Sequence, residues 1–333
     1  MSLSTLGEFG FIDRIRQRLA ANHPGLSVGI GDDAAVFSSR DGWQWVWSVD
    51  ALVEGVHFDR SYVPMESLGW KSLAVNLSDI AAMGAEPRYA LISLAVPDTW
   101  SLQAVDAFYQ GLESCSETYH CPLIGGDTTG SKKDGFISIT LLGEVETGSA
   151  VLRSGAKVGD FLFCTGRLGG ARAGWEILSH GTKQDVPFYE KSIRRFLYPE
   201  PRVEAARWLV KEIPVSAMID ISDGLSSEIH HICRESKVGC VMEESNVPVL
   251  EDAARWFEEK GQRPVEEAII SGEEYQLLFT ASVDHPFPWI KKAREQQIEI
   301  FAIGQIVEAA MGVTIRTKHG EKPLMNRGWN HFQ

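Results

Sequence analysis

The chain has 333 residues, a length typical of about two domains. Its 32 Lys and Arg against 45 Asp and Glu give a net charge of −13, which argues against binding to nucleic acid or to an anionic membrane. No apolar run approaches the about 20 residues of a membrane helix, and the N-terminus lacks the pattern of a signal peptide. The five cysteines form no C-x-x-C pair, so we expect reduced thiols in a cytoplasmic protein.

Apolar, β-prone runs alternate with helical patterns along the chain, which predicts a mixed α/β fold. We expect strands over residues 45–49, 90–96, 136–144, 161–165, 217–221, 276–280 and 298–306. We expect helices over residues 8–19, 65–83, 102–119, 170–178, 201–211, 224–233 and 289–295. The polar, glycine-bearing segment over residues 146–159 suggests an N-terminal α/β domain over residues 1–147 and a C-terminal α/β domain over residues 148–333.

The expected helix over residues 65–83 is apolar on most sides, which is typical of a buried helix. Its polar residues Ser72, Asn76 and Asp79 follow one another at spacings of four and three, so they share one stripe. Such a stripe is either a hydrogen-bonded network in the core or a helix face that lines a site. The sequence leaves both interpretations open.

Several separate segments share one pattern, in which an apolar run ends in Asp and small residues follow. The acids are Asp33, Asp50, Asp127, Asp220 and Asp223, and Asp79 adds one from the helix. In α/β proteins, residues at the carboxyl ends of strands gather at ligand sites. Each Asp alone is readily a turn or cap residue. Oxygen ligands without nearby His or Cys favour Mg²⁺, so the set predicts a site for several metal ions and a phosphate.

A chain with this negative charge needs cations to bind a nucleotide, and Mg²⁺ commonly bridges carboxylates and phosphates. The sequence has neither a Walker loop nor the motifs of protein kinases. Arg153, in a glycine-bearing loop, is either a phosphate contact or a surface charge. Ser222 is either a helix N-cap or a phosphate contact.

Three further residues allow two interpretations each. His57 is a structural histidine or a ligand contact, and Glu273 is a solvated acid or a substrate contact. Trp329, near the C-terminus, either anchors the tail or stacks on a ligand ring.

Six motifs taken together, in order along nearly the whole chain, resemble the thiamine-monophosphate kinase family. They are Gly-Ile-Gly-Asp-Asp-Ala-Ala (29–35), Asn-Leu-Ser-Asp-Ile-Ala-Ala-Met-Gly-Ala (76–85), Leu-Ile-Gly-Gly-Asp-Thr-Thr (123–129), Arg-Ser-Gly-Ala-Lys-Val-Gly-Asp (153–160), Asp-Ile-Ser-Asp-Gly-Leu (220–225) and Ser-Gly-Glu-Glu-Tyr (271–275). The resemblance implies the two-domain fold of the aminoimidazole ribonucleotide synthetase-like superfamily, with the N-terminal sheet pairing with its twin in a homodimer. It also implies ATP and several Mg²⁺ ions in a cleft between the domains.

Carried over position by position, the resemblance assigns roles to individual residues. The implied metal ligands are Asp33, Ser48, Val49, Asp50, Asp79, Asp127, Asp220 and Asp223, where Val49 offers only its backbone carbonyl. The implied ATP contacts are Gly126, Asp127, Arg153 and Ser222, and the implied contacts to thiamine phosphate are His57, Glu273 and Trp329. Two features depart from the family pattern: Ser271-Gly-Glu-Glu replaces the usual Gly-Gly-Glu-Asp, and Trp329 stands where Tyr is frequent.

The implied reaction is ATP-dependent phosphorylation of thiamine monophosphate to thiamine diphosphate by direct in-line transfer. The nucleophile would be a phosphate oxygen, which is largely ionised at neutral pH because the second pKa of a phosphomonoester is about 6. No general base is therefore expected, and metal ions and positioning supply the catalysis. Two alternatives stay open: another ATP-dependent synthetase of the superfamily, and a non-catalytic nucleotide-binding scaffold.

Overall fold

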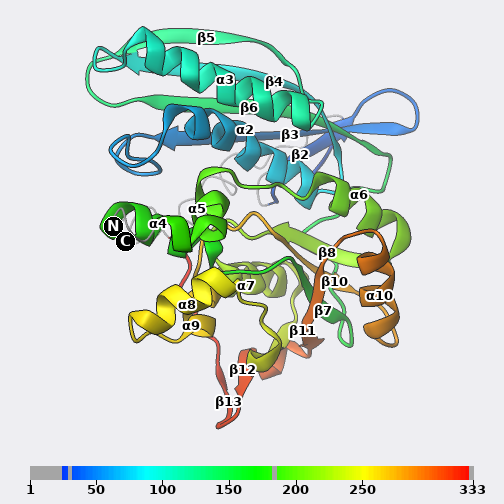
Figure 1. Ribbon diagram of the computed structural model, residues 1–333. Coiled ribbons are helices and arrows are strands. Elements are labelled where there is room, and N and C mark those ends of the chain that lie inside the picture. The colour runs from blue at the N-terminus through cyan, green and yellow to red at the C-terminus, as the bar shows by residue number, and fades with distance from the viewer. Residues whose placement is uncertain (1–24, 29–31, 182–185, 330–333) are drawn as a thin grey trace, which may run out of the picture.

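The computed structural model describes residues 25–28, 32–181 and 186–329. The helix expected over residues 8–19 lies outside this part. Two β-sheets lie one above the other in Figure 1, and helix α2 (Met65–Ala82) packs on the upper sheet and also contacts the lower one. None of the described helices is both long and apolar enough to cross a membrane.

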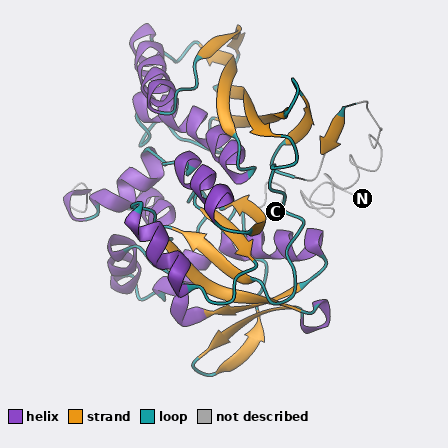
Figure 2. Ribbon diagram, turned by 90° about the vertical axis from the view of Figure 1, so that its right-hand side faces the viewer, coloured by secondary structure: helices purple, strands orange, loops and turns teal. Residues whose placement is uncertain are grey.

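The first sheet has six strands in the order β1-β2-β3-β6-β4-β5, and all neighbours are antiparallel except β4 and β5. Its strands are β1 (Leu26–Val28), β2 (Ala35–Ser38), β3 (Trp43–Val53), β4 (Glu86–Pro97), β5 (Leu123–Ser131) and β6 (Phe136–Glu146). Helices α2 and α3 (Leu102–Thr118) cover one face, while no helix among the described residues lies on the other face (Figure 2).

Alternation along β3 decides which side chains meet α2. Ser48 is buried on the covered face, whereas Val49 points to the open face and is exposed. The pairing of β3 with β6 and of β6 with β4 places Val49, Thr140 and Leu91 in one row across the sheet. Because side chains alternate between faces, Asp50 then returns to the face that α2 covers.

Helix α2 is buried along nearly its whole length, as its apolar sequence predicts. It packs closely on α3, because Gly111 of α3 lies directly against the α2 backbone. A Cβ atom at Gly111 would lie 1.7 Å from the carbonyl oxygen of Glu66, so no other residue fits there without moving a helix. Helix α2 ends at Ala82, and Gly84 follows with a φ of 67°.

The second sheet has seven strands in the order β13-β12-β9-β11-β7-β10-β8. They are β7 (Phe161–Thr165), β8 (Val215–Asp220), β9 (Gly239–Glu243), β10 (Leu277–Ala281), β11 (Ile300–Val307), β12 (Val313–Thr317) and β13 (Gly320–Pro323). Its helices are α4 (Gly170–His180), α5 (Glu190–Leu197), α6 (Val203–Glu212), α7 (Leu225–Ser236), α8 (Glu251–Glu259), α9 (Pro264–Ile269) and α10 (Phe287–Glu295). One apolar core runs from α2 into this sheet and joins Leu77 and Ile80 to Phe163 and Met218.

Every strand and helix expected within the described residues is present, with ends shifted by a few residues. The strand expected over residues 276–280, for example, is β10 (Leu277–Ala281). Strands β1, β2, β5, β9, β12 and β13 and helices α5, α8 and α9 were not among the expected elements. Most of them are short, and β5 contains three glycines, which are uncommon in strands. The predicted boundary between residues 147 and 148 falls in the segment that joins the two sheets, and as a domain limit it stays a prediction.

Candidate active site

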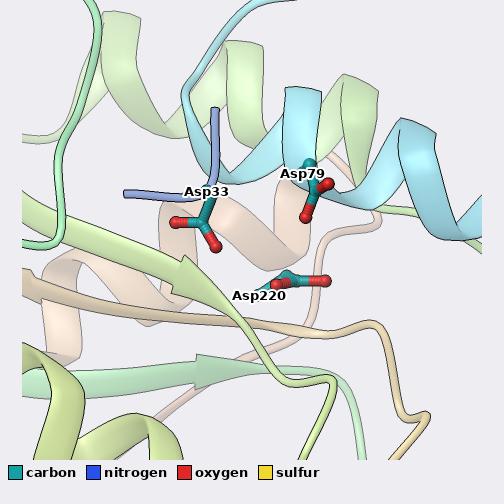
Figure 3. Close-up of side chains that lie close together, drawn as sticks. All are labelled: Asp33, Asp79 and Asp220. Atoms are coloured by element: carbon teal, nitrogen blue, oxygen red, sulfur yellow. The ribbon is translucent and has the colours of Figure 1, made fainter. Parts of the chain in front are cut away.

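Three carboxylates from distant parts of the chain converge where the two sheets face each other. Asp33 precedes β2, Asp79 lies on α2, and Asp220 ends β8. Each offers an oxygen atom that lies within 4.8 Å of the other two (Figure 3). The predicted gathering of Asp side chains is therefore present for these three residues.

Burial and mutual repulsion disfavour the charged form of these groups. Burial raises the pKa of Asp220 to about 8, and the charge of Asp33 adds to the shift. Burial, together with Asp50, Asp220 and Asp33, raises the pKa of Asp79 well above its usual value. Neighbouring Asp50 responds in the same way, because burial and then Asp33 raise its pKa to about 6. A cation among these carboxylates would relieve the repulsion.

Hydroxyl groups orient the carboxylates. Ser48 of β3 donates a hydrogen bond to Oδ2 of Asp79, and Ser78 donates one of 2.6 Å to Oδ2 of Asp220. Ser78 thereby links α2 to the second sheet. Because a hydroxyl that donates to a carboxylate favours its ionised form, both serines partly oppose the effect of burial.

The polar stripe on α2 combines the two interpretations that the sequence left open. Ser72 donates to the carbonyl of Leu68 within the helix, so it is a satisfied core residue. Asn76 donates to the carbonyl of Ser72 and accepts the backbone N–H of Asp50 at 3.0 Å, which fixes β3 against the helix. Asp79 alone of the three belongs to the carboxylate cluster.

Arg153 brings a positive charge to the edge of the cluster. Its Nη2 and Nε atoms lie 2.6 Å and 3.1 Å from the two oxygens of Asp33, a bidentate pair. Its backbone N–H lies 3.2 Å from Oδ2 of Asp32, whose pKa burial and then Asp33 raise to about 7. The segment between the sheets therefore places a guanidinium beside the carboxylate cluster. Arg153 is not a simple surface charge, and its contact with a phosphate stays a prediction.

A second group of predicted residues meets at the start of α7. The carbonyl of Ser222 accepts the backbone N–H of Glu273 at 2.6 Å, and the carbonyl of Asp223 accepts that of Trp329 at 3.0 Å. The Glu273 side chain forms an ion pair of 2.8 Å with Lys71 of α2.

His57, the third residue expected to contact thiamine phosphate, lies in the loop after β3. Its Nδ1 accepts the backbone N–H of Val53 at 3.1 Å.

Asp127 and Gly126 lie apart from the three-carboxylate cluster within one chain. Asp127 is on β5, in register with Ser93 of β4, and both are exposed on the open face of the first sheet. Gly126 packs so closely on β4 that a Cβ atom would lie 1.9 Å from the carbonyl oxygen of Ile92. The side chain of Val49 points to the open face as well, so the role expected for its backbone carbonyl stays a prediction.

Four charged or polar residues of this region were missed by the sequence analysis, namely Asp32, Lys71, Ser78 and Glu228. Glu228 accepts the backbone N–H of Asp223 at 2.9 Å, and burial with the charges of Asp223 and Asp220 raises its pKa well above the usual value. Two sequence features could have pointed to this region. Glu228 is an acid on the helix expected over residues 224–233, and Lys71 is a lysine on the apolar helix expected over residues 65–83.

The comparisons with known proteins agree with this architecture. Residues 31–145 match the family described as AIR synthase related protein, N-terminal domain, and residues 157–316 match the corresponding C-terminal domain. The chain is 36% identical to the thiamine-monophosphate kinase of Bacillus subtilis, over 98% of its own length and 100% of that relative. It is also 36% identical to the thiamine-monophosphate kinase of Escherichia coli, with 98% of each chain covered.

A solved structure described as AaThiL complexed with AMPPCP and TMP has a TM-score of 0.87 and 36% sequence identity, with 99% of each chain covered. The two sheets and the carboxylates between them define a protein of the AIR synthase-related fold. The chain belongs to the thiamine-monophosphate kinase family. The family, the α/β fold and the enzyme class expected from the sequence are therefore confirmed.

Proposed function

We propose that this chain catalyses ATP-dependent phosphorylation of thiamine monophosphate to thiamine diphosphate by direct in-line transfer, assisted by several Mg²⁺ ions. The observation that carries the proposal is the cluster of Asp33, Asp79 and Asp220, whose oxygens lie within 4.8 Å of one another where the two sheets meet. Its family supports the choice of substrates, since a structure with a TM-score of 0.87 is described as a complex with AMPPCP and TMP.

The donor set fits Mg²⁺. It consists of carboxylate oxygens, which hard divalent cations prefer. Burial first, and then neighbouring carboxylates, raise the pKa values of Asp79 and Asp220, so a bound cation would favour their ionised forms. We assign the metal contacts to Asp33, Ser48, Val49 (through its carbonyl), Asp50, Asp79, Asp220 and Asp223, with Asp127 treated separately below. Bound Mg²⁺ would neutralise phosphate charge, which is the main obstacle when two anions react.

The remaining roles belong to residues outside the cluster. Arg153 presents a planar guanidinium suited to bidentate contact with a nucleotide phosphate, and Ser222 and Gly126 complete the proposed ATP contacts. Glu273, Trp329 and His57 are assigned to thiamine monophosphate. The acceptor phosphate needs no general base, so the work of the chain is to hold both phosphates in line and to exclude water.

We further propose a homodimer through the open face of the first sheet. This face exposes several large apolar side chains, namely Trp47, Val49, Tyr89, Leu91 and Phe136. A contiguous apolar face of this kind is typical of a protein interface. Light scattering on the purified protein at micromolar concentration should give the mass of two chains, and a monomer would contradict the proposal.

The dimer gives Asp127 a place in the mechanism. Asp127 lies on the same open face, beside Ser93, and the cluster of its own chain lies on the other side of the sheet. We therefore propose that Asp127 serves the carboxylate cluster of the partner subunit across the interface.

The activity is tested by measuring ADP release from Mg-ATP with and without thiamine monophosphate, and by identifying thiamine diphosphate as the product. We expect turnover that requires both substrates and a divalent cation. Release of ADP that is independent of thiamine monophosphate, or formation of no thiamine diphosphate, would contradict the proposal and favour another activity of the superfamily.

A further inference from the structure

Helix α2, all of whose residues the structure describes, carries a single basic residue, Lys71. Only 3% of its side chain is exposed. Its Nζ atom lies 2.8 Å from Oε1 of Glu273 and 4.1 Å from the centroid of the Phe196 ring on α5. An ammonium group in the protein interior is unfavourable unless an anion and suitable contacts compensate it. The burial of Lys71 therefore depends on Glu273.

Glu273 is held in an uncommon backbone conformation. Its φ is 58°, in the left-handed region that few residues other than glycine adopt. The 2.6 Å hydrogen bond from its N–H to the carbonyl of Ser222 holds it there. Its side chain keeps 31% of its surface exposed, so a ligand can reach it. Strained residues that the surrounding structure holds in place are frequent at ligand sites.

One helix connects this ion pair to the carboxylate cluster. Lys71 and Ser78 lie two turns apart on the face of α2 that meets the second sheet, about 10 Å along the helix axis. Ser78 donates its hydrogen bond to Asp220, while Lys71 contacts Glu273. The helix thus fixes the spacing between the cluster and the Glu273 carboxylate.

We propose that Lys71 is a positioning residue for the acceptor substrate: its ammonium holds the Glu273 carboxylate in the one orientation that accepts a hydrogen bond from the aminopyrimidine of thiamine monophosphate. The proposal rests on the proposed function and adds to it a residue that makes no contact with the substrate itself. A carboxylate fixed before binding loses less rotamer entropy when the substrate arrives. Without the ammonium, the Glu273 side chain is free to rotate toward solvent.

The test is a set of variants assayed for both substrates. Lys71→Met keeps an unbranched side chain of similar length and removes the charge. It should raise KM for thiamine monophosphate about 10-fold and leave kcat and KM for ATP within about twofold. The matched control is Lys292→Met, which removes an exposed ion pair of 2.6 Å with Glu212 and should change neither KM.

A double-mutant cycle separates positioning from folding. Glu273→Gln leaves Lys71 buried without its anion and should lower the melting temperature, whereas Lys71→Met/Glu273→Gln removes both charges and should recover much of that loss. In the Glu273→Gln background, Lys71→Met should have no further effect on KM for thiamine monophosphate. If Lys71 only stabilised the fold, Lys71→Met would either change the KM for both substrates or lower the melting temperature without changing either KM.

Different results would overturn the role of Lys71 and the proposed function. An unchanged KM for thiamine monophosphate in Lys71→Met, or an effect that is additive with Glu273→Gln, would overturn the role of Lys71 and leave the proposed function intact. Wild-type enzyme that forms no thiamine diphosphate would overturn the proposed function, and the role of Lys71 with it.

Discussion

Ser78 of α2 donates a hydrogen bond of 2.6 Å to Asp220 at the end of β8, and both residues are buried. This bond joins the helix that packs on the first sheet to the edge strand of the second sheet. Asp79, the next residue of α2, then lies beside Asp220 and Asp33. The two halves of the chain are thus held together at the place where the carboxylates meet, so the site depends on their relative position.

Asp220→Asn should abolish most of the turnover while the fold persists. The amide keeps the shape of the side chain but removes a charged metal ligand, so we expect kcat to fall by a factor of about 100 or more. The melting temperature of the metal-free variant should be equal to or above that of the wild type, because one of three crowded carboxylates has lost its charge. Turnover at limiting Mg²⁺ and thermal unfolding with a chelator are the measurements.

Ser78→Ala should affect the same site less strongly than Asp220→Asn. The hydroxyl lowers the pKa of Asp220, against the effect of burial. Its loss should weaken the apparent affinity for Mg²⁺ at neutral pH about 10-fold, as expected for a hydrogen bond to a charged group.

For the first variant, Asp220→Asn, wild-type turnover at limiting Mg²⁺ would contradict the assignment of Asp220 to the metal site.

Stability without metal should fall as the pH rises. Burial raises the pKa of Asp50 to about 6, of Asp32 to about 7 and of Asp220 to about 8, whereas the unfolded chain has values of about 3.9. The folded state therefore binds these protons more tightly, and the stabilisation is complete below pH 4 and is lost as the pH rises toward 8.

Saturating Mg²⁺ should oppose this trend, because the cation replaces the protons. Melting temperatures measured between pH 5 and pH 8.5, with a chelator and with Mg²⁺, should diverge increasingly toward high pH. A melting temperature of the metal-free protein that climbs steadily over this range would contradict the assignment.

Two inactive variants should restore activity when their subunits are mixed. Asp79→Asn damages the cluster, and Asp127→Asn damages the residue that we assign to the partner's site. A mixed dimer then has one site with both defects and one with neither. Random exchange makes half of the dimers mixed, so we expect about a quarter of the wild-type activity. Recovery is measured after subunit exchange, with size and mass checked by light scattering.

Mixing Asp79→Asn with Asp220→Asn is the matched control, since both substitutions lie in one cluster and no intact site can form. Exchange without recovery in the first mixture would place Asp127 at the site of its own chain.

The part of the site that the sequence predicted is the part that rests on short motifs. Asp33, Asp79 and Asp220 each follow a recognisable local pattern, and the fold brings them together as expected. The position of Asp127 was not predictable in this way, because the face on which a strand residue lies depends on register with its neighbours, here Ser93. Neither β4 nor β5 contains a signal that sets this register.

Lys71 illustrates a second limit. A lysine within an apolar helix has no sequence pattern that identifies its partner, since Glu273 follows about 200 residues later in the chain.

The short elements were missed for a related reason. Helix α5, with eight residues, is too short for a clear helical period, and its packing on neighbouring elements, mainly α4, stabilises it. Tertiary contacts, which the sequence does not display, decide both cases.

Trp329→Ala should raise KM for thiamine monophosphate about 3- to 30-fold and leave KM for ATP nearly unchanged. The indole is 54% exposed, and a thiazolium ring over its face gains about 0.5–2 kcal/mol from the cation–π interaction. The tail itself is fixed through its backbone, because the N–H of Trp329 donates to the carbonyl of Asp223 and that of Arg327 donates to Ser226. The melting temperature should therefore change little.

Trp329→Phe is the conservative companion and should retain most of the affinity, since it keeps an aromatic face at the same place. Both KM values and the melting temperature, measured for the two variants, separate stacking from anchoring. An indole that only anchors the tail would, on removal to Ala, lower the melting temperature and weaken both substrates together. A KM for thiamine monophosphate that stays at the wild-type value in Trp329→Ala would exclude Trp329 from the substrate site.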